Sequence, residues 1–192
     1  MATLTLRPNS DEDTNYNWIG VGWSDYGYYE CVDEVSPDAD TTHYRRESIG
    51  SEYTEYALHG LPNHTIESGI INFIKVYIRC KYAYATCYAR ARIKTHTTDY
   101  EGDEETLTDS YATYSKQWNT NPNTTSAWTW TEIDDLIAGV TFRTTAYNIT
   151  YCTQVYVEVD YTEEAPTAMG AQLINMNHSG ITTYKAGNVR AN

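Results

Sequence analysis

Tryptophan and tyrosine rings are the side chains in this sequence with the most evident binding chemistry. The chain has five tryptophans and 19 tyrosines among 192 residues. A flat aromatic ring can stack against the apolar face of a sugar, so we consider Trp18, Trp23, Trp128 and Trp130 as a glycan-binding platform. Trp128 and Trp130 would share one face of a strand. The alternative is that these rings close the ends of the core.

An acidic turn contains Asp33, Glu34, Asp38 and Asp40. Carboxylate oxygens are the ligands that Ca²⁺ prefers, and the turn is a weak candidate for a calcium site. It lacks the spacing of an EF-hand loop, which favours a solvated acidic loop. We expect no other metal and no cofactor.

The sequence holds four cysteines, Cys31, Cys80, Cys87 and Cys152. Cys80 and Cys87 would lie on the inner face of one hairpin, described below, where a cross-strand disulfide is geometrically possible. The alternative is that all four are small buried thiols.

Catalytic motifs are missing from the sequence. The five histidines match no metal-binding spacing, and there is neither a G-x-S-x-G elbow nor a glycine-rich phosphate loop. We therefore predict no catalytic residues and no enzyme activity.

The clearest structural pattern covers residues 70–95. Apolar side chains alternate with polar ones, first at Ile74, Val76, Ile78 and Cys80 and then at Cys87, Ala89, Ala91 and Ile93. Alternation of this kind is typical of strands with one buried face. We expect the two runs to form a β-hairpin with an apolar inside and a basic, aromatic outside.

Elsewhere the sequence also favours β-structure. Residues 151–161 alternate most clearly, which predicts an inner strand, and the one helix signal begins at Thr131 and ends before Gly139. The predicted fold is all-β: a two-sheet antiparallel, jelly-roll-like β-sandwich with one short helix in residues 1–162, and an extended C-terminal arm in residues 163–192.

The net charge is −13 and the pI is about 4.6, which disfavours nucleic acid and membrane partners. The N-terminal residues show no export signal. Residues 165–192 carry Lys185 and Arg190 without any acidic residue. The arm could lie against its own body or a neighbouring subunit. Since the body is acidic, we expect it to dock on a neighbouring subunit, through the residues Leu173, Ile174, Met176, Ile181, Tyr184, Lys185 and Arg190.

A set of segments is considered together: residues 31–34, 37–42, 107–114, 118–122, 127–134, 136, 138–140 and 152–161. Together these segments resemble a β-sandwich domain of virion structural proteins from tailed phages and related prokaryotic viruses, and the resemblance covers about residues 2–162. It implies a structural component of a virion with a jelly-roll-like fold. Fold alone does not establish such a role.

These observations favour a non-enzymatic virion structural protein, a capsid decoration or an appendage subunit, that assembles through its arm. Its partners would be copies of itself or other virion proteins, and it would be extracellular after release. The alternatives are a carbohydrate-binding module that uses exposed aromatic rings, or a subunit of a cell-surface filament.

Overall fold

The computed structural model describes residues 1–164 except 16–18, 22–27, 39, 48–51 and 66–68. Residues 165–192 lie outside the described part, and the side chains of Ile19 and Val21 are also left out. The strands are β1 (Ala2–Leu6), β2 (Ser10–Thr14), β3 (Ile19–Val21), β4 (His43–Glu47), β5 (Tyr53–Gly60), β6 (Ile70–Ala83), β7 (Cys87–Thr95), β8 (Thr98–Glu101), β9 (Glu105–Thr106), β10 (Ala112–Trp118), β11 (Ile137–Thr144) and β12 (Ile149–Thr162). A 3₁₀ helix, η1 (Tyr28–Cys31), and an α-helix, α1 (Trp130–Asp134), complete the described elements.

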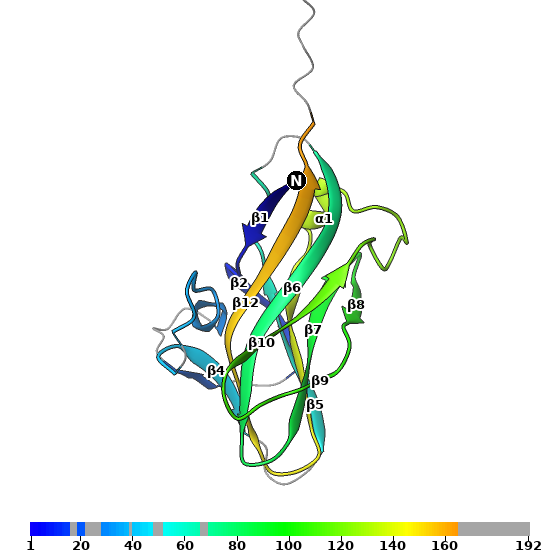
Figure 1. Cartoon of the computed structure of the whole chain (residues 1–192). Coiled ribbons are helices and arrows are strands. Elements are labelled where there is room, and N and C mark those ends of the chain that lie inside the picture. Colours follow the sequence, from blue (N-terminus) through cyan, green and yellow to red (C-terminus); the bar gives the residue numbers. More distant parts are fainter. Residues whose placement is uncertain (16–18, 22–27, 39, 48–51, 66–68, 165–192) are drawn as a thin grey trace, which may run out of the picture.

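The strands form two antiparallel sheets that pack face to face (Figure 1). Sheet A has the order β10-β6-β12-β4-β3, with β1 beside β12; sheet B has the order β2-β5-β11-β7-β8, with β9 beside β7. The strands β5, β6, β7, β10, β11 and β12 alternate between the two sheets along the chain. The predicted all-β sandwich with one short α-helix is therefore confirmed.

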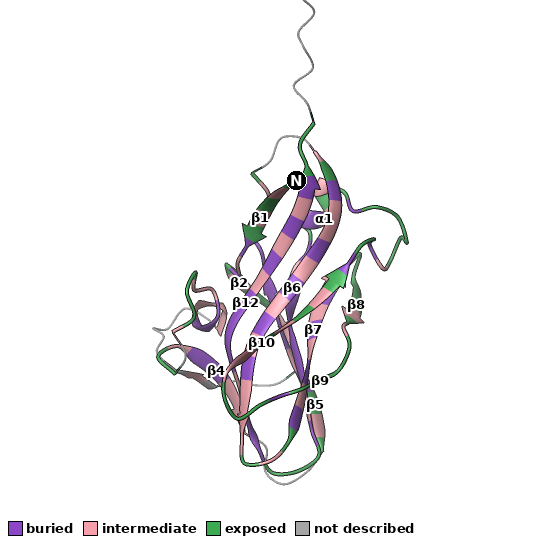
Figure 2. Ribbon diagram, viewed as in Figure 1, coloured by how far each residue is buried: buried purple, intermediate pink, exposed green. Residues whose placement is uncertain are grey.

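The centre of sheet A is the long pair β6 and β12. Their inward side chains face one another in register, Ile78 opposite Val155 and Val76 opposite Val157. All four are buried, and the burial alternates along both strands (Figure 2). Burying such a side chain contributes about 1.5–3 kcal/mol. The alternation predicted for residues 151–161 is confirmed.

The predicted hairpin over residues 70–95 is wrong in its pairing. Both runs are strands with the expected buried faces. However, β6 pairs with β10 and β12 in sheet A, whereas β7 pairs with β8, β9 and β11 in sheet B. The connection after Ala83 carries the chain from one sheet to the other. This arrangement buries the two apolar faces against each other, which a flat hairpin cannot do.

The predicted disulfide between Cys80 and Cys87 is also wrong, for the same reason. The two residues lie in different sheets, and the four cysteines are buried and form no disulfide within the described part of the chain. In sheet A the residue opposite Cys80 is Cys152. Burial raises the pKa of the Cys80 and Cys87 thiols above their usual value.

Helix α1 begins two residues earlier than the sequence signal suggested. Its N-cap is Thr129, not Thr131, and Thr129 and Glu132 form a reciprocal capping box. Ile137 belongs to β11 instead of the helix. No helix in the described ranges is long and apolar enough to cross a membrane.

Candidate functional site

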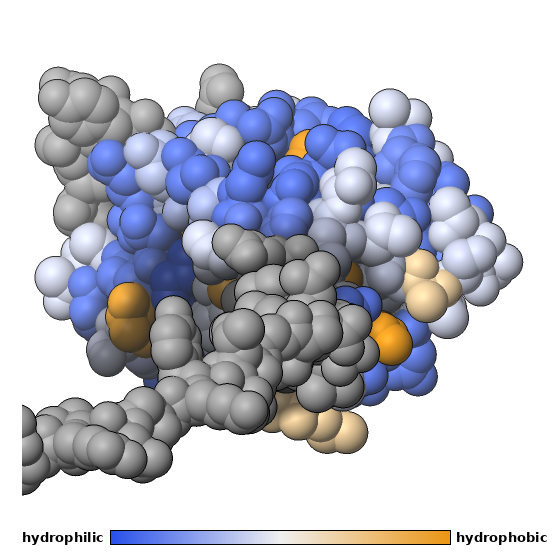
Figure 3. All heavy atoms as spheres, turned by 90° about the horizontal axis from the view of Figure 1, so that it is seen from above, coloured by the Kyte–Doolittle hydropathy of each residue, from blue (hydrophilic) through white to orange (hydrophobic). Residues whose placement is uncertain are grey.

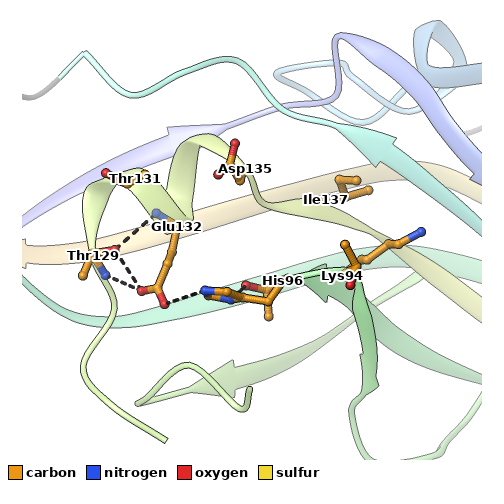
Figure 4. Close-up of a pocket in the computed structure, with 9 residues that line it drawn as sticks. Lys94, His96, Thr129, Thr131, Glu132, Asp135 and Ile137 are labelled. Carbon is orange, nitrogen blue, oxygen red and sulfur yellow. Dashed lines mark hydrogen bonds and ion pairs between the residues drawn. The ribbon is translucent and has the colours of Figure 1, made fainter. Parts of the chain in front are cut away.

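A cleft of about 520 Å³ opens at one end of the sandwich, between α1 and the turn that joins β7 to β8 (Figure 4). Seen from above, the described surface at the α1 end is mostly hydrophilic, with isolated hydrophobic residues (Figure 3). The cleft is lined by Lys94, Thr95, His96, Thr97, Thr129, Thr131, Glu132, Asp135 and Ile137.

The carboxylate of Glu132 is the most connected group in this cleft. It accepts hydrogen bonds from the Thr129 backbone N–H at 2.8 Å and from Asn121 Nδ2 at 2.9 Å, and His96 Nε2 lies 3.6 Å from it. The Thr129 contact belongs to the helix cap, and the Asn121 and His96 contacts tie α1 to the neighbouring segments. Because no Trp, Tyr or Phe lines the cleft, it offers no phenol or indole ring on which a sugar could stack.

The outer face of sheet A has a different composition. We call it the tyrosine face, and its side chains alternate with the buried ones along each strand. It consists of Lys75, Tyr77 and Arg79 on β6, Gln154, Tyr156, Glu158 and Asp160 on β12, Thr113, Ser115 and Gln117 on β10, and Arg7 after β1.

Two parallel tyrosine rings stand at the centre of this face. Tyr77 and Tyr156 are opposite each other in register, with their ring centroids 4.6 Å apart and an interplanar angle of 9°. The separation matches the spacing of neighbouring strands, so the rings stack as successive rungs across the sheet. Burial and the Glu158 carboxylate raise the pKa of both phenols.

The stack has a neighbour on each side. Beyond Tyr156, the Arg7 guanidinium lies 5.1 Å from the ring centroid. Beyond Tyr77, the residue opposite on β10 is Ser115, which is small and exposed. The ring face of Tyr77 that is turned away from Tyr156 therefore has no bulky side chain opposite it on β10; we call this the open position. The Lys75 ammonium lies 4.8 Å from the centroid of the Tyr77 ring.

The outer face of sheet B is built mainly from ion pairs. Arg90 and Arg92 share Glu101 at 2.7 and 2.9 Å, and Arg90 and Arg143 share Glu104 at 2.8 and 2.6 Å. Hydrogen bonding from Arg143 holds the pKa of Glu104 below its usual value. The cations of this face are matched by carboxylates of the same chain.

The tryptophans do not form the predicted platform. Trp128 is buried, with 4% of its surface exposed, and its Nε1 donates to the Trp118 carbonyl oxygen at 3.1 Å. Trp130 is half-buried at the start of α1, where it stacks on His64 with centroids 4.9 Å apart. They are not on a strand, so they share no strand face. The alternative, that these rings close the core, describes both, while Trp18 and Trp23 lie outside the described residues.

Only two carboxylates of the acidic turn lie close together. The Thr42 hydroxyl donates to Glu34 and the Thr42 backbone N–H donates to Asp38, whereas Asp40 pairs with Lys81 at 2.6 Å. Among the described residues, no three His, Cys, Asp or Glu side chains are grouped closely enough to hold a metal ion. The predicted calcium site of Asp33, Glu34, Asp38 and Asp40 is therefore not assembled in the described part.

The predicted assembly arm cannot be placed. Its residues, from Leu173 to Arg190, fall outside the described part of the chain. The last described strand, β12, ends at Thr162, next to the predicted boundary of the sandwich. Docking of the arm on a neighbour stays a prediction.

Comparisons with known proteins give only distant matches. No protein-family model matches the chain, and no curated protein matches it. A solved xylan-binding domain, CBM22-1 of Xyn10C from Paenibacillus barcinonensis, is 8% identical, with a TM-score of 0.40 over 84% of this chain and 95% of that domain. The family 11 carbohydrate-binding module of the cellulosomal cellulase Lic26A-Cel5E from Clostridium thermocellum is 11% identical, with a TM-score of 0.36 over 84% and 97%.

Proposed function

We propose that this chain is a non-enzymatic carbohydrate-binding module that holds a glycan across the tyrosine face. The observation that carries the proposal is the parallel pair of Tyr77 and Tyr156 beside the open position over Ser115. A sugar ring placed there would stack on the face of the Tyr77 ring that is turned away from Tyr156. Aromatic surface surrounded by a few oriented polar groups is the usual make-up of a ligand site.

The polar side chains around the Tyr77–Tyr156 stack can bind a ligand rich in hydroxyl groups. Ser115, Thr113 and Gln117 border the open position along β10, and all three are exposed. Glu158 and Asp160 offer acceptors on β12. Hydroxyls, amides and carboxylates can each donate to or accept from sugar hydroxyls, so the face can orient a glycan as well as stack it.

The virion role expected from the resemblance receives no support from the comparisons. Because the arm that would carry assembly lies outside the described residues, that role is not part of this proposal.

The test is affinity electrophoresis through gels that contain a panel of soluble neutral and acidic polysaccharides. We expect at least one polysaccharide to retard the wild-type protein and Tyr77→Ala to lose at least tenfold in affinity for it. The matched control is Tyr88→Ala, because Tyr88 is also a half-buried tyrosine beneath a cation, Arg143 at 4.2 Å, but lies in sheet B. Equal losses in both variants, or no retardation in any gel, would contradict the proposal.

A further inference from the structure

The distribution of unpaired cations singles out the tyrosine face. The described part of the chain has eleven Lys and Arg side chains, and eight of them make an ion pair with a carboxylate. Within the described residues, the three that make none are Arg7, Lys75 and Arg79. All three belong to the tyrosine face, although acidic residues outnumber basic ones 26 to 13 in the whole sequence.

Two of these cations bracket the open position. Lys75 and Arg79 lie two residues before and after Tyr77 on β6, so each is about 6.6 Å from it along the strand. The Lys75 ammonium lies over the Tyr77 ring, 4.8 Å from its centroid, so a sugar stacked there would displace it to one side, with Arg79 on the other. Lys75 has Glu158 opposite it on β12, whereas Arg79 has the neutral Gln154. The Arg79 end is therefore the more positive end of the site.

Arg79 also has donors to spare. Its Nη1 donates to the Thr113 hydroxyl at 3.3 Å, and its Nε is buried without a hydrogen-bond partner. Because this Nε is buried, a ligand anion would bind the guanidinium at its terminal nitrogens, where charge-assisted hydrogen bonds are stronger than neutral ones. The flat guanidinium fork matches a carboxylate or sulfate group better than it matches a hydroxyl.

We propose that the glycan of the tyrosine face is acidic, with a carboxylate or sulfate group bound by Arg79 and the sugar ring stacked on Tyr77. This inference rests on the proposed function. The ligand would be oriented along β6, its anionic group toward Arg79 and its hydroxyls toward Glu158 and Asp160. Because the protein carries a net charge of −13, overall electrostatics oppose a polyanion, and binding has to come from this local site.

The experiment uses pairs of polymers that share a sugar backbone and differ in charge. Polygalacturonate is compared with its fully methyl-esterified form, and dextran sulfate with dextran, by isothermal titration of the full-length protein. We expect the charged member of at least one pair to bind at least tenfold more tightly than its neutral counterpart. Which pair shows the difference tells carboxylate from sulfate recognition.

Variants separate this inference from the proposed function. Arg79→Gln should lower affinity for the charged polymer about tenfold, whereas Arg90→Gln, the same change on sheet B, should leave it unchanged. Neutral and charged polymers that bind alike, with Arg79→Gln silent and Tyr77→Ala still deleterious, would overturn the acidic ligand and keep the glycan site. If neither these polymers nor any of the panel binds the wild-type protein, both proposals fail.

Discussion

The two outer faces of the sandwich carry similar residues, but they differ in whether their cations are paired with carboxylates. Each has tyrosines beneath cations: Arg143 lies 4.2 Å from the Tyr88 ring on sheet B, and Arg7 lies 5.1 Å from the Tyr156 ring on sheet A. On sheet B the arginines are neutralised by carboxylates from the β8–β9 segment. On the tyrosine face the cations are left unpaired. The arginines of the first face are ion-paired within their own chain, although the Arg92 Nε is buried without a hydrogen-bond partner, whereas the three cations of the second face make no ion pair among the described residues.

The largest loss of stability is expected from a substitution in sheet B at Gly139, on the outer side of β11. A Cβ at this position would lie 1.9 Å from the Ala57 carbonyl oxygen, which belongs to the backbone of β5. Since backbone cannot move aside as a flexible side chain can, we expect Gly139→Ala to lower the free energy of unfolding by about 3 kcal/mol. Urea denaturation measures it, with Ser115→Ala on the tyrosine face expected to stay within about 0.5 kcal/mol. A Gly139→Ala protein as stable as wild type would show that sheet B is not closely packed there.

The open position beside Tyr77 can be filled by mutating Ser115. Ser115→Tyr places a third ring beside Tyr77, where the sugar is proposed to stack. We expect affinity for the glycan to fall at least tenfold, with Ser115→Ala close to wild type. Ser115 is exposed on a strand, so the stability of either variant should change by less than about 0.5 kcal/mol. Unchanged binding by Ser115→Tyr would place the ligand elsewhere.

The ion pairs of sheet B should matter for stability and not for binding. Glu104 holds Arg90 and Arg143. Because these groups are partly exposed, Glu104→Gln should cost only about 0.5–1 kcal/mol of unfolding free energy. Glycan affinity should not change. A loss of affinity comparable to that of Tyr77→Ala would mean that the two faces are coupled.

Acid should weaken sheet B by the same route. The Arg143 hydrogen bond lowers the pKa of Glu104 in the folded protein, relative to an ordinary value of 4.5. Such a group contributes stability that is complete above about pH 4.5 and is lost as the pH falls through the lowered pKa. Denaturation midpoints between pH 3 and pH 7 should therefore drop less steeply below pH 4.5 in Glu104→Gln than in wild type. Identical slopes would show that this pair does not contribute.

The sequence predicts the faces of the strands well and their partners poorly. Alternation places Val76 and Val157 on the buried faces of their strands, whatever strands pair with them, and both residues are buried. The same alternation in residues 70–95 fits a hairpin and a crossing between sheets equally well, because it specifies a face and not a neighbour. Only the pairing of β6 with β12 decides between them.

The candidate site was missed for a related reason. The alternation places Tyr77 and Tyr156 on outer faces, but their stacking depends on two strands far apart in the sequence becoming neighbours. The sequence-based prediction named the tryptophans instead, because their rings are the largest. Trp128 serves the core, and no local pattern distinguishes a ring that plugs the interior from one that binds a ligand.

The most direct test of the central claim is to locate the ligand by amide chemical shifts. A ¹⁵N-labelled protein is titrated with a fragment of the polysaccharide that binds most tightly in the panel. We expect the largest shifts in β6, β10 and β12, centred on Tyr77, Ser115 and Tyr156, and little change in β7 and β11. Shifts centred on sheet B, or on the cleft between Thr97 and Glu132, would contradict the account.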